Sequence, residues 1–537
     1  MANLAVLHAV RRRVRREFGI IRAMKPMAAT ISDSRTLAGT GRGRECEDKT
    51  ALRKNRLAAN TLAIWGRSVA AMLLGLFSSR WIFQSLGAET LGLYYALAAL
   101  MSFAGMVGGV LQLSMTRSLS IALGGAAGGE SASERETAEV MRGSVLLALC
   151  FAAALLCVAM PLGEATVARR ISAPEGFGGI ARLAWRLMVA GTALGAAGMP
   201  AAALLAARQR FFPLSAIGLG QSAGYFLLAW TMCFALAGLG RERLLAVFVA
   251  GNTAIGLAAA LATILVARRD RLRAAAPAAP AVPAVPRQAG AALRRAAAMA
   301  RYAACELWSA LGDTVRRNGT SLYLNSVFGG VATAAWGIGS TVNNHASSLS
   351  AAISGATMPA AMKSGSEGLE VALASARWGF MATAVFAVPL CFLAGPALRL
   401  WLGSPPEGAA FFASALVAGT AVQRLGAAQH LAVMKNGRVA VYHAVVGSLS
   451  MLTVALAAAL CPFAGWRAAG WAFIADFAAI TAARVVLGRA IAGVGVRLWA
   501  KKVLLPSAAF AVALVLFFAV ANAALAPLLH LFPSARP

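Results

Sequence analysis

The feature that most constrains this chain is a series of apolar runs, each about 20 to 28 residues long. An α-helix rises 1.5 Å per residue, so a run of this length crosses a hydrocarbon core of about 30 Å. The runs recur thirteen times, and 59% of the residues are hydrophobic while only 13% are charged. A water-soluble fold cannot bury that much apolar surface. We therefore expect an all-α polytopic membrane protein with thirteen transmembrane helices, within a range of about twelve to fourteen.

The apolar runs also set the approximate boundaries of the spans. These are 57–83, 91–116, 143–163, 183–206, 212–237, 244–267, 302–327, 331–355, 378–402, 408–432, 439–462, 468–488 and 503–530. A segment rich in Arg, Ala and Pro follows the sixth span and divides the chain into two halves. The expected organisation is a basic cytoplasmic extension at 1–56, a first six-helix lobe at 57–267, a cytoplasmic linker at 268–296, a second six-helix lobe at 297–490 and an additional transmembrane helix within 491–537.

A weak echo between the halves supports this division. Gly87 stands seven residues ahead of Tyr94, and Gly329 stands seven residues ahead of Trp336. Each pair flanks the first helical hairpin of its half. Two related halves around a site near the membrane midplane are a common plan in transporters.

The placement of charge gives the orientation. In a soluble protein a net charge of +30 would indicate a nucleic-acid partner. Here 35 of the 50 Lys and Arg residues lie on the side of the membrane that holds the N-terminus, 7 lie on the other side and 8 lie within spans. Cytoplasmic loops carry such an excess of basic residues. We therefore expect a bacterial inner-membrane protein with a cytoplasmic N-terminus and no nucleic-acid partner.

The N-terminal extension carries five arginines between Arg11 and Arg16, with apolar residues interleaved at helical spacing. No apolar h-region follows, so a cleavable signal peptide is not expected. Two interpretations stay open. In the first, the segment is an interfacial helix on an anionic leaflet, with part of the extension disordered. In the second, the start codon is assigned too early, and the true first residue is Met24 or Met27.

Charged residues inside the spans indicate where a polar cargo would bind, because each costs about 2.5–3.5 kcal/mol on insertion scales. Arg67 lies about ten residues into the first span, too deep to reach the interface easily. In the seventh span, Asp313 can face both Arg316 and Arg317 through i,i+3 and i,i+4 spacing. One arginine would then keep a free positive charge that suits a diphosphate. The alternative is a structural ion pair between helices.

The eighth span carries more hydroxyl and amide side chains than a lipid-facing surface would hold. They predict either a wet cavity that contacts sugar or polar packing against a neighbouring helix. Further intramembrane charges follow in the tenth and twelfth spans. The predicted substrate-binding residues are Arg67, Arg316, Arg317, Asn343, Asn344, His345 and Arg424, and the candidates for carrying a coupling cation, H⁺ or Na⁺, are Asp313 and Asp476.

No motif for catalysis or metal binding stands out. The seven cysteines are scattered without a CxxC pair or a Cys/His cluster, so neither a metal site nor a disulfide framework is expected. The phosphate-binding pattern GxxxxGK[ST] is absent. The non-cytoplasmic loops are short, whereas polymerases and ligases of exported glycans usually need a large external loop. We expect no enzymatic site and no cofactor beyond a coupling cation.

Two stretches resemble a known family. The first, at 60–103, is NTLAIWGRSVAAMLLGLFSSRWIFQSLGAETLGLYYALAALMSF. The second, at 312–364, is GDTVRRNGTSLYLNSVFGGVATAAWGIGSTVNNHASSLSAAISGATMPAAMKS. Both resemble Wzx-type polysaccharide flippases of the multidrug/oligosaccharidyl-lipid/polysaccharide (MOP) exporter superfamily. The resemblance covers about residues 57–490.

This resemblance implies two six-helix lobes around a V-shaped cavity that opens alternately to each side. The implied cargo is a polyprenyl-diphosphate-linked oligosaccharide, flipped to the periplasmic leaflet for cell-surface polysaccharides such as lipopolysaccharide O-antigen or exopolysaccharide. The implied partners are this cargo, membrane lipids, a polysaccharide polymerase and other export components. Two alternatives stay open: a cation-coupled multidrug exporter of the MATE type, and a membrane glycan polymerase or ligase.

Overall fold

The structure is a computed structural model that describes residues 42–124, 130–274, 289–361, 366–435 and 439–529. It divides the chain into two compact units, residues 1–62 and 63–537. In the first unit the described residues are the helical start of α3 (Arg42–Gly124). The predicted interfacial helix and the proline-rich part of the linker lie outside the described residues. The other described helices belong to the second unit.

Six spans at the beginning of the second unit, residues 63–274, are called the first helical set. The first two form a hairpin within α3, divided at Gly87, which has φ 73° and ψ 173°. Glycine adopts this positive φ readily because it has no Cβ. The other spans are α4 (Glu130–Ala154) with η2 (Leu155–Ala159) and α5 (Met160–Arg170), α6 (Gly178–Gly195) with η3 (Ala196–Gly198) and α7 (Met199–Ala207), α8 (Phe211–Trp230) with η4 (Thr231–Ala235), and α9 (Arg241–Ala274).

The next six spans, residues 289–492, are called the second helical set. Their first hairpin divides at Gly329, which has φ 81° and ψ −171°. The helices are α10 (Ala289–Thr314) with η5 (Val315–Gly319), α11 (Thr320–Ala361), α12 (Ser366–Leu402), α13 (Ala409–Arg424) with α14 (Ala427–Lys435), α15 (Val439–Ser450) with α16 (Leu452–Ala464), and α17 (Ala468–Ala492). The last span comprises α18 (Val496–Trp499), η6 (Ala500–Leu504) and α19 (Leu505–Leu529).

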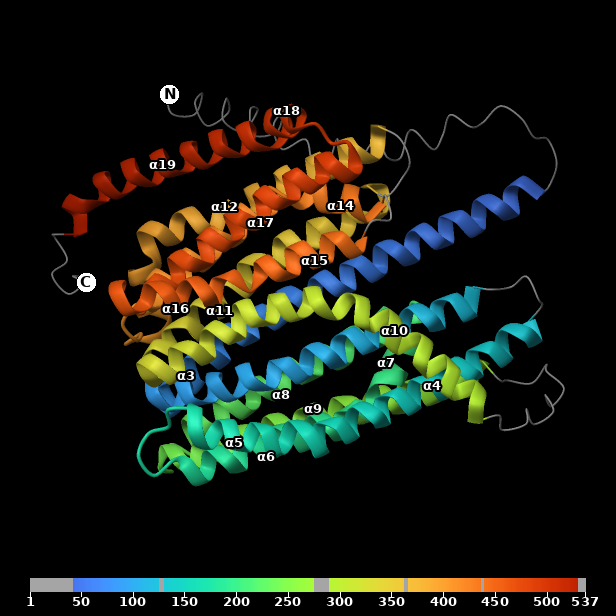
Figure 1. Cartoon of the computed structure of the whole chain (residues 1–537), viewed down its shortest axis with the longest axis horizontal. Helices are drawn as coiled ribbons and strands as arrows, with labels where there is room; N and C mark the ends of the chain where they lie inside the picture. Colours follow the sequence, from blue (N-terminus) through green and yellow to red (C-terminus); the bar gives the residue numbers. More distant parts are fainter. Residues whose placement is uncertain (1–41, 125–129, 275–288, 362–365, 436–438, 530–537) are drawn as a thin grey trace, which may run out of the picture. The chain divides into compact units, whose positions relative to one another are not determined.

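These helices confirm the predicted all-α fold with thirteen spans, and the described residues contain no strand. The long helices of the second unit run in roughly the same direction, as expected for a bundle that crosses one membrane (Figure 1). Among the described residues, nine helices are long and apolar enough to cross a membrane, or ten if the bent pair α13–α14 counts as one span. Helices α10 and α11 are not among them, because polar residues lower their hydropathy.

The echo between the halves is confirmed in the backbone. Gly87 and Gly329 have almost the same φ and ψ, and each forms the corner of the first hairpin in its set. The two corners also meet. A Cβ added to Gly92 would stand 2.0 Å from the carbonyl oxygen of Gly330, so the backbones of α3 and α11 are in direct contact there. At the same end, the Asn325 Oδ1 accepts a hydrogen bond from the backbone N–H of Ser172 at 2.9 Å.

The two sets also meet at the opposite end of the helices. The Ser114 hydroxyl of α3 donates to the carbonyl oxygen of Met299 in α10 at 2.7 Å. The Arg295 Nη2 of α10 lies 3.0 Å from the Glu136 carboxylate of α4, and the Glu139 carboxylate lies 3.8 Å from the Arg295 Nε. The two sets therefore contact each other at both ends of the helices.

Candidate functional site

A network of ion pairs lies where the π-turn η5 interrupts the seventh span. The side chain of Arg316 is 2% exposed, whereas that of Arg317 is 47% exposed. Asp313 pairs with both arginines, and its carboxylate lies 3.1 Å from the Arg317 Nη2. The predicted geometry, one aspartate facing two arginines, is confirmed. The wider π-turn directs one guanidinium into the core and leaves the other accessible.

The buried guanidinium of Arg316 has a second carboxylate partner. Its Nη1 lies 3.4 Å from the Asp476 Oδ2 of α17, and it also stacks 4.2 Å from the ring centroid of Phe477. The Thr453 hydroxyl donates to the same carboxylate oxygen at 2.7 Å. Asp476 is completely buried.

This second carboxylate corrects one expectation from the sequence. The sequence predicted a single aspartate between two arginines and hence a free positive charge. Asp313 and Asp476 together balance Arg316 and Arg317, so the four side chains carry no net charge. Any uncompensated positive charge must come from other residues.

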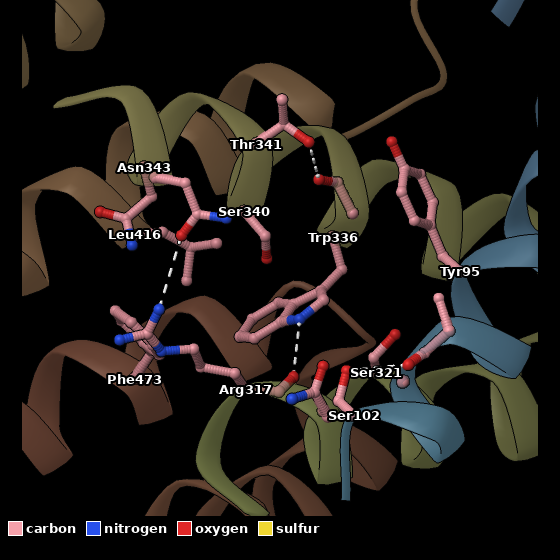
Figure 2. Close-up of a pocket in the computed structure, with 15 residues that line it drawn as sticks. Tyr95, Ser102, Arg317, Ser321, Trp336, Ser340, Thr341, Asn343, Leu416 and Phe473 are labelled. Carbon is pink, nitrogen blue, oxygen red and sulfur yellow. Dashed lines mark hydrogen bonds between the residues drawn. The ribbon is translucent and has the colours of Figure 1, made fainter. Parts of the chain in front are cut away.

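Next to this network, a pocket of about 190 Å³ lies between the two sets. Figure 2 shows its lining side chains, which come from α3 on one side and from η5, α11, α13 and α17 on the others. The lining residues are Tyr95, Ala98, Ala99, Ser102, Arg317, Asn318, Ser321, Trp336, Gly337, Ser340, Thr341, Asn343, Asn344, Leu416 and Phe473.

The chemistry of the pocket is that of one accessible cation among hydroxyls and amides. The Arg317 Nη1 donates to the Asn344 Oδ1 at 3.5 Å, and the Trp336 Nε1 donates to the Arg317 carbonyl oxygen at 3.1 Å (Figure 2). The Oδ1 of Asn343 is buried and has no hydrogen-bond partner among the described residues. These groups can bind an anion beside a hydroxyl-rich molecule.

The predicted binding residues do not all reach this pocket. Arg317, Asn343 and Asn344 line it, whereas Arg316 lies behind it within the ion network. His345 faces α3 instead, where its Cε1 would stand 3.6 Å from a Cβ added to Gly75. Their roles in binding stay predictions.

The remaining two predicted residues lie in other spans. Arg424 ends α13 and is not among the residues that line the pocket. Arg67 falls within α3, but its side chain lies outside the described residues. The structure therefore brings only some of the predicted binding residues together around one pocket.

Sequence reasoning missed the α3 wall of the pocket. Tyr95, Ala98, Ala99 and Ser102 follow helical i, i+3, i+4, i+7 spacing, and this face of small and polar residues could have indicated an interior wall. Arg484 of α17 was also missed, although it is one of the basic residues within spans.

The two aspartates proposed to carry a coupling cation both contact the Arg316 guanidinium. Among the described residues, no group of three or more His, Cys, Asp or Glu side chains could hold a metal ion. The assignment of Asp313 and Asp476 to H⁺ or Na⁺ coupling stays a prediction.

Comparisons with known proteins identify the fold. No family model and no curated protein matches the sequence. Among solved structures, an outward-facing MATE multidrug resistance transporter of the MOP superfamily aligns with a TM-score of 0.55 and 14% identity, over 80% of this chain and 95% of its own. The lipid II flippase MurJ, inward closed, aligns with a TM-score of 0.56 and 11% identity, over 87% of this chain and 100% of its own.

A MOP superfamily transporter from Pyrococcus furiosus aligns with a TM-score of 0.52 and 15% identity, over 82% of this chain and 97% of its own. The chain therefore has the fold of MOP superfamily transporters. The solved structures with this fold are described as transporters and a flippase. The Wzx-type subfamily stays a prediction.

Proposed function

We propose that the protein flips a polyprenyl-diphosphate-linked oligosaccharide across the bacterial inner membrane by alternating access, for the synthesis of cell-surface polysaccharide such as O-antigen or exopolysaccharide. The observation that carries the proposal is the pocket, where one accessible guanidinium, that of Arg317, lies beside hydroxyl and amide groups. A guanidinium grips phosphate oxygens with paired hydrogen bonds, and hydroxyls and amides bind sugars.

The polyprenyl tail would stay in lipid, since only the polar head is costly to transfer through hydrocarbon. The similarity in fold to the lipid II flippase MurJ supports this arrangement. The pocket of about 190 Å³ is smaller than the roughly 300–1,000 Å³ of typical ligand sites. Loading an oligosaccharide head therefore requires the two helical sets to separate at one end.

The proposal includes a direction and an energy source. On the positive-inside pattern of the sequence the N-terminus would be cytoplasmic, and the cargo would then enter from the cytoplasmic leaflet and leave to the periplasmic leaflet. Exchange of H⁺ or Na⁺ would drive the cycle through Asp313 and Asp476. Release of Asp476 from Arg316 would leave a buried carboxylate without its cationic partner, which would link ion exchange to a change of conformation.

The decisive test is the leaflet in which lipid-linked repeat units accumulate when the gene is deleted. We expect labelled intermediates to be trapped on the cytoplasmic side and export of the surface polysaccharide to stop. Normal export in the deletion strain would overturn the proposal. Accumulation on the periplasmic side would place the protein after flipping, as a polymerase or ligase would be.

A second candidate, a cation-coupled multidrug exporter, is favoured by the MATE structures that share the fold. Sites for cationic drugs need accessible acidic residues, and Asp476 is completely buried under Arg316. Increased sensitivity of the deletion strain to cationic drugs, with polysaccharide export intact, would support this candidate and exclude the flippase.

A further inference from the structure

The tenth span is broken inside the membrane. Helix α13 ends at Arg424, α14 begins at Ala427, and their axes differ by 45°. Arg424 is fifteen residues from the start of α13 at Ala409, which corresponds to about 22 Å along the axis. The break therefore lies within the thickness of the hydrocarbon core. Discontinuous helices at such depths commonly form ion and substrate sites in transporters.

The backbone carbonyl groups at the break already have partners. The Thr481 hydroxyl of α17 donates to the Val422 carbonyl oxygen at 3.1 Å, and the Trp499 Nε1 donates to the Leu425 carbonyl oxygen at 2.8 Å. Neutral donors thus satisfy two of the carbonyl groups at the break.

Two arginines nevertheless lie at the break. The stem of Arg484 rests on the backbone of Gly426, where an added Cβ would stand 2.9 Å from the Arg484 Cδ. Its Nη1 makes a long contact of 3.4 Å with the Gln423 carbonyl oxygen. Arg424 is the last residue of α13, two positions before Gly426. The Nε atoms of both arginines are buried without a hydrogen-bond partner among the described residues.

No carboxylate among the described residues pairs with either arginine. The ion pairs between described residues in this set involve other arginines, such as Arg316 and Arg467, and none places a carboxylate oxygen within 4.0 Å of Arg424 or Arg484. The partial negative charge at the end of α13 is offset by the partial positive charge at the start of α14. Both half-buried arginines therefore lack a carboxylate partner among the described residues, and a charge within a span is costly without a counter-ion.

A buried amide without a partner lies in the first turn of the next helix, α14. Gln429 lies in the first turn of α14, is 1% exposed, and has neither amide atom hydrogen-bonded among the described residues. Its side chain packs against Gly488 of α17, one helical turn beyond Arg484. Buried amides are hydrogen-bonded in most proteins. The first-turn N–H groups of α14 add further donors at this helix N-terminus.

We propose that Arg424, Arg484, Gln429 and the N-terminus of α14 form a binding site for a phosphoryl anion within the second helical set. Guanidinium groups bind phosphate through paired hydrogen bonds, and a helix N-terminus adds donors of the same polarity. The anion is either free inorganic phosphate or pyrophosphate, or the diphosphate of a lipid. The site does not depend on the proposed cargo.

The test is the thermal stability of the purified full-length protein in detergent with increasing sodium pyrophosphate, at ionic strength held constant with sodium chloride. We expect a saturable rise in melting temperature for the wild type. Arg424→Gln and Arg484→Gln should each reduce the apparent affinity at least tenfold. The matched control is Arg489→Gln, which removes an exposed charge from the same helix and should bind as the wild type does.

Two further variants keep the test decisive if Arg484→Gln fails to fold. Arg424→Lys keeps the charge but loses the planar fork, so its affinity should fall between those of wild type and Arg424→Gln. Gly426→Ala keeps both charges and displaces the Arg484 stem, and it should also weaken binding. Equal pyrophosphate responses in all variants, or an equal response of the wild type to chloride, would overturn the proposal.

Farnesyl diphosphate distinguishes the two sources of the phosphoryl group. If the site receives a lipid head, farnesyl diphosphate should compete with pyrophosphate, and Arg424→Gln should also impair export. If it receives the free anion, pyrophosphate should bind without such competition. Loss of pyrophosphate binding with intact export would support this site and show that it is separate from the flippase function.

Discussion

Tyr94 in the first helical set packs on Phe248 with ring centroids 4.8 Å apart. Trp336, at the same distance after its hairpin glycine in the second set, packs on Phe473 at 5.9 Å. The two sets thus share hairpin corners and aromatic packing. They differ in the residue at the equivalent position of the span that precedes each hairpin glycine. Thirteen residues before Gly87 stands Leu74, whereas thirteen residues before Gly329 stands Arg316.

The comparison shows that one architecture supports two kinds of interior. Among the described residues, the ion pairs of the first set lie at the ends of its helices, such as that between Arg208 and Asp270, or at exposed positions, such as that between Arg186 and Glu164. The second set instead holds Arg316 and Asp476 in its core. Among the described residues, the buried charges that could select a cargo therefore lie in the second set.

The largest effect is expected for Arg316→Met. It leaves the buried Asp476 without its cationic partner, and breaking a buried pair in this way costs about 3–5 kcal/mol. The measurement is unfolding of the purified protein by SDS titration. Leu74→Met, the matched change in the first set, should cost less than about 1.5 kcal/mol. Restored stability in Arg316→Met combined with Asp476→Leu would locate the cost in the unpaired carboxylate. Wild-type stability of the single variant would refute the network.

The next effect concerns transport. Arg317→Gln should lower the export rate about tenfold or more, since a hydrogen bond to a charged group contributes about 1.5–3 kcal/mol. Its stability should change little because the side chain is half exposed. Transport of radiolabelled lipid-linked oligosaccharide in membrane vesicles would measure the export rate.

Arg67→Ala provides the comparison from the first set. If Arg67→Ala inserts normally and exports at the wild-type rate, Arg67 is removed from the proposed site and the second set alone holds the diphosphate.

A smaller effect is expected where helices of the second set approach most closely. A Cβ at Gly312 would stand 2.2 Å from the Gly447 carbonyl oxygen, so Gly312→Ala should destabilise by about 1–3 kcal/mol through overpacking. The first set again offers a control, because a Cβ at Gly105 meets no atom within 4 Å. Gly105→Ala should leave SDS unfolding unchanged or slightly improved. Equal behaviour of the two variants would contradict the described packing of α10 against α15.

The smallest effect is expected at the contact between the sets. Glu136→Gln removes an exposed ion pair with Arg295, worth about 0.5–1 kcal/mol. Separation of the sets should then become about two- to fivefold more frequent. Labelling of Ser340→Cys, at the pocket wall and in a background without native cysteines, would report it. Glu407→Gln, which breaks a pair with Arg467 inside one set, should leave the labelling rate unchanged.

The sequence predicted most of the fold because span length and hairpin glycines are local signals. The apolar runs located all thirteen helices, including α10 and α11, whose low hydropathy makes them hard to recognise. The predicted pairing of Asp313 with two arginines rested on helical spacing and is seen in the structure.

The remainder of the site could not be predicted, because it depends on contacts between distant spans. Asp476 meets Arg316 across 160 positions of sequence, and no local pattern relates them. Arg424 was predicted to line the cavity. Whether its side chain reaches the pocket or stays at the break of the tenth span depends on how α13 packs against its neighbours. The break itself, at a Leu-Gly pair, leaves no proline as a signal.

The ion pair between Arg316 and Asp476 also has a consequence for synthesis. The ribosome completes α10 and η5 long before it reaches α17, so a nascent chain that ends ahead of α17 holds Arg316 with Asp313 as its sole carboxylate neighbour in the network. Helix α10 is also too polar to count as a span on hydropathy alone. The seventh helix should therefore settle into the bilayer late, when the twelfth helix arrives to complete the network, and chains truncated before α17 should be preferred substrates for membrane proteases.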